Sequence, residues 1–192
     1  MIITISGRPG SGKSAVAIRV AGELGIRHIS AGDFMREMAA ERGVSILELS
    51  RSAEGDEAID HEIDARTTRF ADRGGDFVMD ARLGWYFIPD SVKVFLDVRP
   101  EIAAGRIYGA GRGAEHENVD LETTMRAIET RTMSESARYE EYYGIDYLDS
   151  DHYDLVVDTS DLPIETVVER IVAHARRAAG EPDVGDRTPG AL

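Results

Sequence analysis

The sequence predicts an α/β fold in which a five-stranded parallel sheet lies between helices. Three observations support this fold class. Short, mostly apolar runs alternate with helix-compatible stretches, which is typical of parallel strands joined by crossover helices. The first apolar run leads directly into a glycine-rich turn and a helix-compatible stretch, within residues 2–24. With 192 residues, 42% of them hydrophobic, the chain is long enough to bury one core.

Short runs of strand-forming residues, bounded by turn residues, predict the five strands. Asp80 ends the third run, and Pro89-Asp90 precedes the fourth. Because most of the runs are apolar throughout, they indicate strands with both faces covered by helices. In chain order, the expected strands are residues 1–6, 27–30, 77–79, 92–96 and 154–157.

Helices are predicted between these runs, and several of their ends carry characteristic residues. Gly25 and Gly43 are expected to stop the first two helices, since glycine is favoured just past a helix end. Pro100 and Pro163 each open a helix at its first turn, where the missing backbone N–H is not needed. The expected helices are 15–24, 33–42, 45–54, 57–73, one from Pro100, 121–143 and one from Pro163.

Residues 1–179 are interpreted as one domain with two moving parts. The helical stretch 33–73 is the first. A loop at 109–120 is the second, because its glycines and lack of periodicity predict mobility. Residues 180–192 combine two prolines with few apolar side chains, which predicts a disordered tail.

Residues 7–14 fit the P-loop pattern G-x-x-x-x-G-K-[ST], and they lie between a strand and a helix as the motif requires. Glycines let successive backbone N–H groups point at phosphate oxygens, and the helix N-terminus adds partial positive charge. Lys13 would reach the β- and γ-phosphates, and Ser14 would hold Mg²⁺. The expected ATP contacts in this segment are Gly7, Arg8, Pro9, Gly10, Ser11, Gly12, Lys13, Ser14 and Ala15.

Three charged residues after predicted strands are candidates for the rim of the same site. Asp80 ends a buried strand, where ligands bind in open α/β sheets, and would orient Mg²⁺ through water or through Ser14. Arg82 lies two residues further on and would clamp a second phosphate. Arg36 lies in the first turns of the helix after the second strand. The alternatives are a helix-capping aspartate and solvated surface arginines.

Four more arginines are candidates for contacts with ATP or with the transferred group. Arg131 and Arg138 are seven residues apart, so they share one face of the long predicted helix. Arg106 and Arg112 flank the glycine-rich loop and would close over ATP with it. Solvated surface positions are the alternative for all four.

The charge balance and the absence of cysteine limit the partners and the compartment. A net charge of −14 repels nucleic acids and anionic membranes, so neither is expected as a partner. No disulfide can form, and the N-terminal apolar run is too short for a signal peptide. A cytoplasmic monomer acting on small nucleotides is therefore expected.

Several segments together resemble the P-loop nucleoside monophosphate kinases, and specifically the short, archaeal-type cytidylate kinases. The resemblance covers most of residues 1–178. Its most discriminating part is the Ser-Ala-Gly-Asp-x-x-Arg sequence that ends at Arg36. The segments that carry it are residues 2–15, 28–37, 80–82, 89–97, 131–143 and 153–160.

The resemblance implies a P-loop kinase fold with Mg²⁺ as cofactor, 33–73 as the acceptor-binding segment and 109–120 as the lid. It implies transfer of the γ-phosphoryl group of ATP to a nucleoside monophosphate, CMP or dCMP. Arg36 and Arg82 would bind the acceptor phosphate, and Arg131 and Arg138 would lie across the phosphates. The implied catalytic residues are Lys13, Asp80, Arg131 and Arg138; the implied acceptor contacts are Ser30, Gly32, Asp33, Arg36, Asp64 and Arg82.

The chain departs from the family pattern next to the third strand. Asp80-Ala81-Arg82 stands where the short cytidylate kinases usually read Glu-Gly-Arg, and the aromatic pair Trp85-Tyr86 follows. These aromatics would lie near the acceptor or fill the core. Residues that read the base are expected in the 45–70 helices. The candidates there are Asp60, Asp64, Arg66 and Thr67, with plain surface roles as the alternative.

Two other functions stay open at this point. One is a kinase for another nucleotide or a small phosphorylated metabolite. The two acceptor-side arginines favour an anionic acceptor over a neutral sugar. The other is a nucleotide-dependent switch or regulatory ATPase, which the short chain and the acceptor arginines disfavour. The acceptor base and the preference for ribose or deoxyribose are not determined by the sequence.

Overall fold

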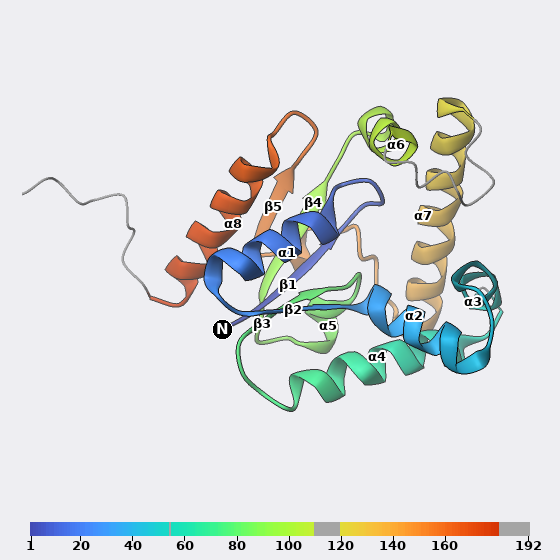
Figure 1. The fold of residues 1–192 in the computed structure, drawn as a ribbon, viewed down its shortest axis with the longest axis horizontal. Helices are drawn as coiled ribbons and strands as arrows, with labels where there is room; N and C mark the ends of the chain where they lie inside the picture. The colour runs from blue at the N-terminus through green and yellow to red at the C-terminus, as the bar shows by residue number, and fades with distance from the viewer. Residues whose placement is uncertain (54, 110–119, 181–192) are drawn as a thin grey trace, which may run out of the picture.

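A computed structural model describes residues 1–53, 55–109 and 120–180 of the chain (Figure 1). Its centre is a five-stranded parallel sheet with the strand order β2-β3-β1-β4-β5. The predicted fold class and the five strands are confirmed, with ends that differ by at most one residue. The strands are β1 (Ile2–Gly7), β2 (Arg27–Ser30), β3 (Phe77–Asp80), β4 (Val92–Asp97) and β5 (Leu155–Asp158).

The helices cover both faces of the sheet, and α1 lies beside α8 on one of them (Figure 1). The α-helices are α1 (Lys13–Leu24), α2 (Ala31–Arg42), α3 (Ile46–Ser52), α4 (Glu57–Ala71), α5 (Gly84–Phe87), α6 (Pro100–Gly109), α7 (Leu121–Tyr143) and α8 (Ile164–Ala178). A short 3₁₀ helix, η2 (Ser150–His152), precedes β5. Neither α5 nor η2 was predicted, because one turn is too short to show helical periodicity.

Capping side chains explain where α2 and α3 begin, and a third helix, α4, ends earlier than predicted. The Ser30 hydroxyl accepts the N–H of Gly32 at 3.1 Å, so α2 begins two residues earlier than the predicted 33. Ser45 and Glu48 form a capping box, which places Ser45 outside α3. The helix α4 ends at Ala71 and not at 73, with Asp72 as its C-cap.

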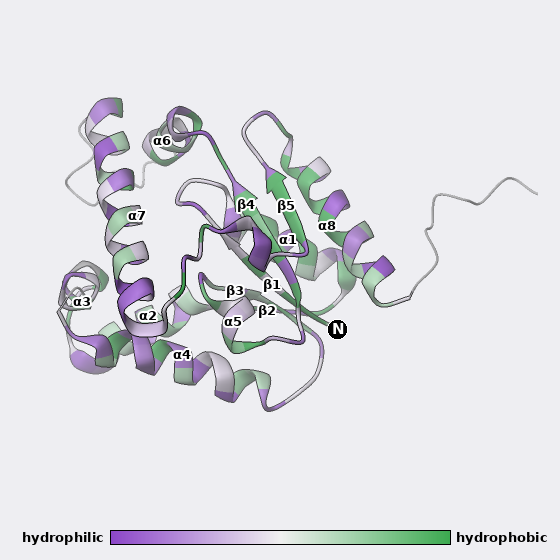
Figure 2. Ribbon diagram, turned by 180° about the vertical axis from the view of Figure 1, so that it is seen from behind, coloured by the Kyte–Doolittle hydropathy of each residue, from purple (hydrophilic) through white to green (hydrophobic). Residues whose placement is uncertain are grey.

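The main core lies between the sheet and the helix pair α1–α8. Apolar side chains from β1 and β4, such as Ile3, Ile5 and Leu96, are fully buried there against Val20 and Ile171. Figure 2 shows the strands and the inner helix faces as the most hydrophobic parts of the ribbon. Burial of this kind contributes about 25 cal/mol per Å² of apolar surface, which makes this layer the main source of stability.

The segment α2–α3–α4 has a small core of its own, apart from the sheet. Its fully buried members are Met38, Ala39, Leu49, Ala53 and Ile59. The segment therefore packs as a unit at one end of the molecule, beside α7 (Figure 1). This arrangement places the predicted acceptor segment as one body next to the carboxyl ends of the strands.

Two predictions fall largely outside the described residues. Most of the lid at 109–120, including Arg112, and nearly all of the 180–192 tail belong to that part of the chain. Among the residues that the structure describes, no helix is both long and apolar enough to cross a membrane.

Candidate active site

The P-loop residues form one turn that joins β1 to α1 at the carboxyl edge of the sheet. Gly10 has a φ of +80°, and a Cβ there would lie 2.7 Å from the Cβ of Ala103, so glycine is required where the loop crosses α6. Gly12 caps α1 with a φ of +83° and no side-chain cap. The first N–H groups of α1 are therefore left for a ligand, which is the arrangement that binds phosphate.

The side chains of Lys13 and Asp80 are in contact next to the P-loop turn. The Lys13 ammonium group, on the first residue of α1, forms an ion pair with the carboxylate of Asp80 at the end of β3. Asp80 is only 1% exposed. Burial lowers the pKa of Lys13. Burial opposes ionisation of Asp80 as well, yet the charge and hydrogen bond of Lys13 hold the pKa of that carboxyl below its usual value.

The second carboxylate oxygen of Asp80 is available for another ligand. Asp80 Oδ2 is buried and has no hydrogen-bond partner among the described residues, and Nε2 of His28 is 4.0 Å away. No cluster of three or more His, Cys, Asp or Glu side chains suited to a metal occurs within the described ranges. A cation here would thus have few protein ligands besides phosphate oxygens and water, which suits Mg²⁺.

Arg82 is buried against α7 and the P-loop. Its Nε donates to Oε2 of Glu135 at 2.7 Å, and its Nη1 donates to the Gly7 carbonyl at 2.8 Å. Arg131 donates to the other Glu135 oxygen at 2.9 Å. Burial alone would raise the pKa of Glu135, but the charges of Arg82 and Arg131 lower it to about 2. The Glu135 carboxylate therefore holds two predicted site residues, Arg82 and Arg131, beside the P-loop.

Glu135 is a site residue that the sequence reasoning missed. It lies four residues after Arg131 and three before Arg138, so the helical spacing places it on the same face of α7. That spacing was the available signal. The partner Arg82 is 53 residues away in sequence, and no local pattern connects the two.

Arg138 and two aspartates join α7 to α4. Arg138 Nε donates to Oδ2 of Asp60 at 2.9 Å, and both side chains are largely buried. The Tyr143 hydroxyl donates to Asp64 and lies 3.0 Å from Nδ1 of His61. Burial raises the pKa of Asp60, and it raises the pKa of Asp64 to about 7. Two of the candidate base-reading residues therefore face α7.

The other two candidates for reading the base, Arg66 and Thr67, have different surroundings. The Arg66 guanidinium is held by three glutamates, Glu37, Glu41 and Glu62. Thr67 is buried and donates to the carbonyl of Ile63 within its own helix. The structure thus sets Arg66 apart from Asp60 and Asp64, although all four candidates were predicted on one helix.

We expect Asp64→Asn to change how stability depends on pH. Between the ordinary aspartate pKa and 7, folded protein binds more protons at Asp64 than unfolded protein does. The free energy of unfolding therefore falls as pH rises through this window. Asparagine removes that loss, so the variant should gain up to about 4 kcal/mol relative to wild type between pH 4 and pH 8.

Urea unfolding across this pH range measures the Asp64→Asn effect. Asp151→Asn, at an exposed aspartate in η2, is the matched control and should show no such trend. A difference between Asp64→Asn and wild type that stays constant with pH would contradict the expectation.

The start of α2 holds the predicted acceptor-phosphate contacts. Arg36 forms an ion pair with Asp33 one turn earlier, and both side chains are more than half exposed. Its guanidinium folds back toward Gly32, where an added Cβ would lie 3.7 Å from Nη1. Ser30 is occupied in capping the helix. Arg36 can therefore turn toward a phosphate by giving up one exposed ion pair, which is worth at most about 1 kcal/mol.

Two further arginines, predicted to contact ATP, stabilise the loops around the P-loop. Arg106 Nη2 donates to the carbonyl of Thr159 at 2.6 Å, and its Nη1 reaches the carbonyl of Gly10 at 3.4 Å. Arg8 Nε donates to Asp97 Oδ1 at 2.8 Å. These contacts tie the P-loop to the ends of β4 and β5. Contact of either arginine with ATP stays a prediction.

Trp85 and Tyr86, the aromatic pair after Arg82, differ in burial. Trp85 is 8% exposed, packs with Phe95 and Tyr139, and stacks on His152 with ring centroids 4.4 Å apart. It fills the core. Tyr86 is 42% exposed, and its ring centroid is 6.0 Å from that of Tyr143. Of the two, only Tyr86 lies on the side where α4 and α7 meet.

Residues 2–161 match the cytidylate kinase-like family, a span that includes the P-loop, Arg36, Asp80, Arg82 and α7. The chain belongs to this family. Among its relatives, the cytidylate kinase of Haloquadratum walsbyi is 38% identical over 184 residues, which cover 95% of this chain and 92% of the relative. The cytidylate kinase of Methanothermobacter thermautotrophicus is 42% identical over 160 residues, which cover 83% and 96%. The resemblance inferred from the sequence is thereby confirmed.

Solved structures with the same fold include kinases outside the cytidylate kinase-like family. The shikimate kinase of Bacteroides thetaiotaomicron superposes with a TM-score of 0.65 at 16% identity, covering 94% of this chain and 98% of that one. A protein from Eubacterium ventriosum gives a TM-score of 0.68 at 18% identity, covering 91% and 98%. At these identities the likeness concerns the fold alone.

Proposed function

We propose that the protein transfers the γ-phosphoryl group of ATP to CMP or dCMP and releases ADP with CDP or dCDP. One observation carries the proposal: relatives named cytidylate kinase are 36–42% identical to it over most of its length. The site geometry agrees, because Lys13, Arg82 and Arg131 converge at the P-loop edge of the sheet. Such convergence suits a reaction between two polyanions.

In the proposed reaction, positioning and charge do most of the catalytic work. Phosphoryl transfer needs in-line geometry and neutralisation of the equatorial oxygens, and it needs little covalent help. The N–H groups at the start of α1 would hold the β-phosphate, and Lys13 would follow the transferred group. Arg131 and Arg138 would exchange their carboxylate partners for phosphate oxygens. Arg82, held by Glu135 and Gly7, would present its remaining N–H groups to the acceptor phosphate.

Mg²⁺ is part of the proposal. Ser14 and Asp80 would hold it, with Asp80 acting through water, and the unpartnered Oδ2 of Asp80 suits that role. When bound, the ion supplies further neutralisation of the β- and γ-phosphates. We also propose that 33–73 is the acceptor-binding segment and that 109–120 acts as a lid. In the proposal, Arg106 and Arg112 close with this lid.

The proposed setting is a cytoplasmic monomer that takes small nucleotides as partners. The net charge of −14 supports the exclusion of nucleic acids and anionic membranes, because both would be repelled. The P-loop edge is the exception, since its cations are gathered from several elements. Polyanionic ligands would thus be attracted to one place on an otherwise acidic molecule.

The proposed acceptor is tested by a panel of monophosphates. We expect CMP or dCMP to exceed AMP and GMP by at least roughly 10²-fold in kcat/KM, with UMP between them. A mismatched base would leave buried polar groups unpaired, at about 1–3 kcal/mol for each group. ADP release with ATP and each acceptor in turn measures this preference. A better rate with AMP would overturn the cytidylate assignment. ATP binding without any accepted monophosphate would favour a switch or regulatory ATPase.

Arg36→Ala tests the acceptor side separately from ATP. We expect acceptor binding to weaken by roughly 1.5–3 kcal/mol, the scale of a hydrogen bond to a charged group, while ATP affinity changes little. Arg42→Ala, which removes another exposed arginine of α2, is the matched control and should leave both affinities unchanged. Calorimetric titration of each variant with CMP and with ATP measures the two effects. Equal loss of both affinities in Arg36→Ala would assign the residue to ATP.

A further inference from the structure

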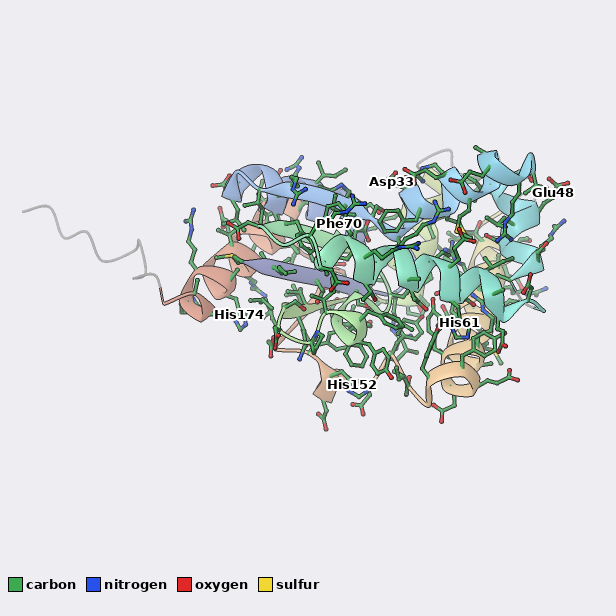
Figure 3. The ribbon with its side chains drawn as sticks, turned by 90° about the horizontal axis from the view of Figure 1, so that it is seen from below. Asp33, Glu48, His61, Phe70, His152 and His174 are labelled. Carbon is green, nitrogen blue, oxygen red and sulfur yellow. The ribbon has the colours of Figure 1, made fainter. Side chains whose placement is uncertain are left out.

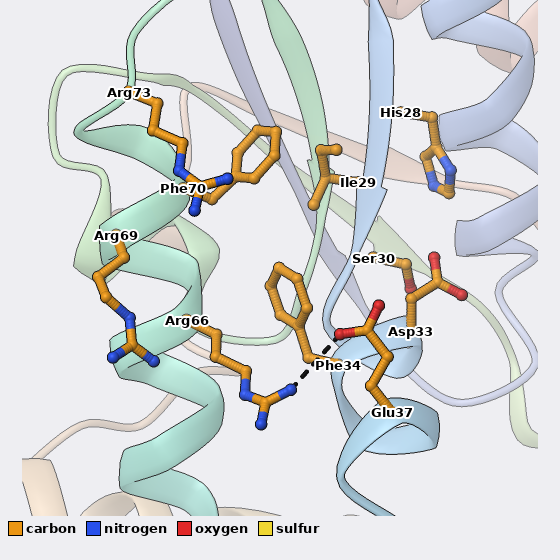
Figure 4. Close-up of a pocket in the computed structure, with 10 residues that line it drawn as sticks. All are labelled: His28, Ile29, Ser30, Asp33, Phe34, Glu37, Arg66, Arg69, Phe70 and Arg73. Carbon is orange, nitrogen blue, oxygen red and sulfur yellow. Dashed lines mark hydrogen bonds and ion pairs between the residues drawn. The ribbon is translucent and has the colours of Figure 1, made fainter. Parts of the chain in front are cut away.

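A groove of about 600 Å³ lies at the β2 edge of the sheet (Figure 4). It is formed by the edge strand β2, by the start of α2, and by α4 with the residue Arg73 just beyond its end. In Figure 3, Phe70 lies on the part of α4 near this edge of the sheet, while His61 lies on the part near α7. The residues that line the groove are His28, Ile29, Ser30, Asp33, Phe34, Glu37, Arg66, Arg69, Phe70 and Arg73.

The groove shares Ser30, Asp33 and Arg66 with the residues predicted to contact the acceptor, but the rest of its lining lies away from the face of α4 that meets α7. Asp60 and Asp64, which meet α7, are one turn apart on one face of α4. Helical spacing places Arg66 and Arg69 on the opposite face. On α2, likewise, Phe34 lines the groove, whereas Met35 packs into the small core of the segment. The groove therefore opens on the outer side of both helices.

Its charges are unevenly matched. Asp33 and Glu37 are its two acids, and they are paired with Arg36 and Arg66. In the part of the chain that the structure describes, neither Arg69 nor Arg73 has a carboxylate partner. Unpaired cations stand out in a chain with 36 acidic residues against 22 basic ones. The mouth of the groove thus carries free positive charge.

Two aromatic rings complete the lining. Phe34 comes from α2 and Phe70 from α4, and both rings point into the groove in Figure 4. At the rim, the guanidinium of Arg27 lies 5.0 Å from the centre of the Phe70 ring, and it donates to the carbonyl of Gly74 at 3.3 Å. The groove therefore combines flat apolar walls with guanidinium groups, which bind phosphate oxygens in pairs.

We propose that this groove is a second nucleotide site. The base would lie against Phe34 and Phe70, and the phosphates would contact Arg69 and Arg73. The volume is within the range of sites for ligands of this size. A bound nucleotide would bridge α2 and α4, and α2 also carries Arg36. The site itself is inferred from the groove alone, while the blocker used to test it rests on the proposed function.

The test is equilibrium dialysis with radiolabelled CTP. Adenosine and cytidine joined 5′ to 5′ through five phosphates is added in excess to fill the catalytic site. We expect wild-type protein to keep one bound CTP per chain under these conditions. The double variant Arg69→Ala/Arg73→Ala should bind it at least 10-fold more weakly. Arg170→Ala/Arg177→Ala, which removes two exposed arginines of α8, is the matched control and should bind as wild type does.

The remaining arms identify what the groove recognises. Inorganic tripolyphosphate and cytidine, used as competitors, should each displace CTP at least 10-fold less well than unlabelled CTP does. Tripolyphosphate that competes as well as CTP would reduce the groove to a plain anion site. An acidic peptide, hexaglutamate, that competes equally would assign it to a protein partner. No CTP retained beside the blocker, or equal binding by the Arg69→Ala/Arg73→Ala variant, would overturn the proposal.

The two hypotheses can fail separately. Should the blocker itself fail to bind, the proposed kinase function is in error, yet loss of CTP binding in the double variant still identifies the groove. Both arginines are exposed, so the variant is expected to fold. Its thermal unfolding, compared with that of the α8 control, verifies this.

Discussion

Lys13→Ala is expected to lower kcat on the order of 10²-fold or more. The ammonium group lies where charge develops during transfer, and such electrostatic contacts are worth several kcal/mol in the transition state. Steady-state ADP release with ATP and CMP measures the loss. The chain has one other lysine, and Lys93→Ala is the matched control, because Lys93 is in the first half of β4, away from the carboxyl edge of the sheet. Activity above about a tenth of wild type in Lys13→Ala would refute the phosphate role.

Stability needs its own control in this experiment. Removing Lys13 leaves the buried Asp80 carboxylate without its cation, and an uncompensated buried charge is destabilising. The double variant Lys13→Met/Asp80→Asn removes both charges and should recover stability without recovering activity. Recovery of both would mean that the Lys13→Ala defect is one of folding.

Arg82→Ala is expected to destabilise the fold by about 3 kcal/mol. Arg82 and Glu135 are both largely buried, and removal of one partner of such a pair leaves the other charge uncompensated. Arg131→Ala is the matched control, since Arg131 binds the same carboxylate but its side chain is 65% exposed. That variant should lose at most about 1 kcal/mol. Equal losses in urea unfolding would show that burial does not separate the two arginines.

The Arg82–Glu135 pair should also affect how the free energy of unfolding changes at low pH. The pKa of Glu135 is depressed to about 2, so its contribution to stability is complete above the ordinary glutamate pKa and is lost as pH falls toward 2. In Arg82→Ala this depression shrinks, and less stability remains to be lost between pH 4.5 and pH 2. Unfolding curves at intervals across this window measure the change. A slope identical to that of wild type would contradict the assignment.

Local patterns were sufficient to predict the strands and the P-loop. The motif is contiguous, and its position between a strand and a helix is itself a local pattern. Parallel strands buried on both faces read as apolar runs, so the three inner strands could be recognised directly, and the edge strand β5 was recognised from its apolar residues Leu155, Val156 and Val157. Arg27–Ser30 is one of the two edge strands, with only partial burial at most positions, and its polar sequence reflects that position.

The carboxylates that hold the arginines were beyond the reach of local patterns. Arg82, Arg131 and Arg138 could be selected because arginine near a phosphate site has a known use. Their partners are set by how α7 crosses the P-loop edge and α4, and that crossing depends on packing of Tyr139 and Tyr147 far along the chain. Trp85 illustrates the same limit, since its burial follows from η2 and His152 rather than from its neighbours in sequence.

The shared carboxylate of Glu135 also constrains how this sequence can diverge. A single change that removes the charge of Arg82 or Glu135 leaves the other buried charge uncompensated, so such intermediates would be selected against. Loss of charge at position 82 or 135 is therefore expected to be accompanied by a change at the other position, whereas burial does not tie position 131 to them, because its side chain is 65% exposed. Replacement of this pair during evolution therefore requires that both residues change together, or that a nearby cation compensates for the loss of Arg82.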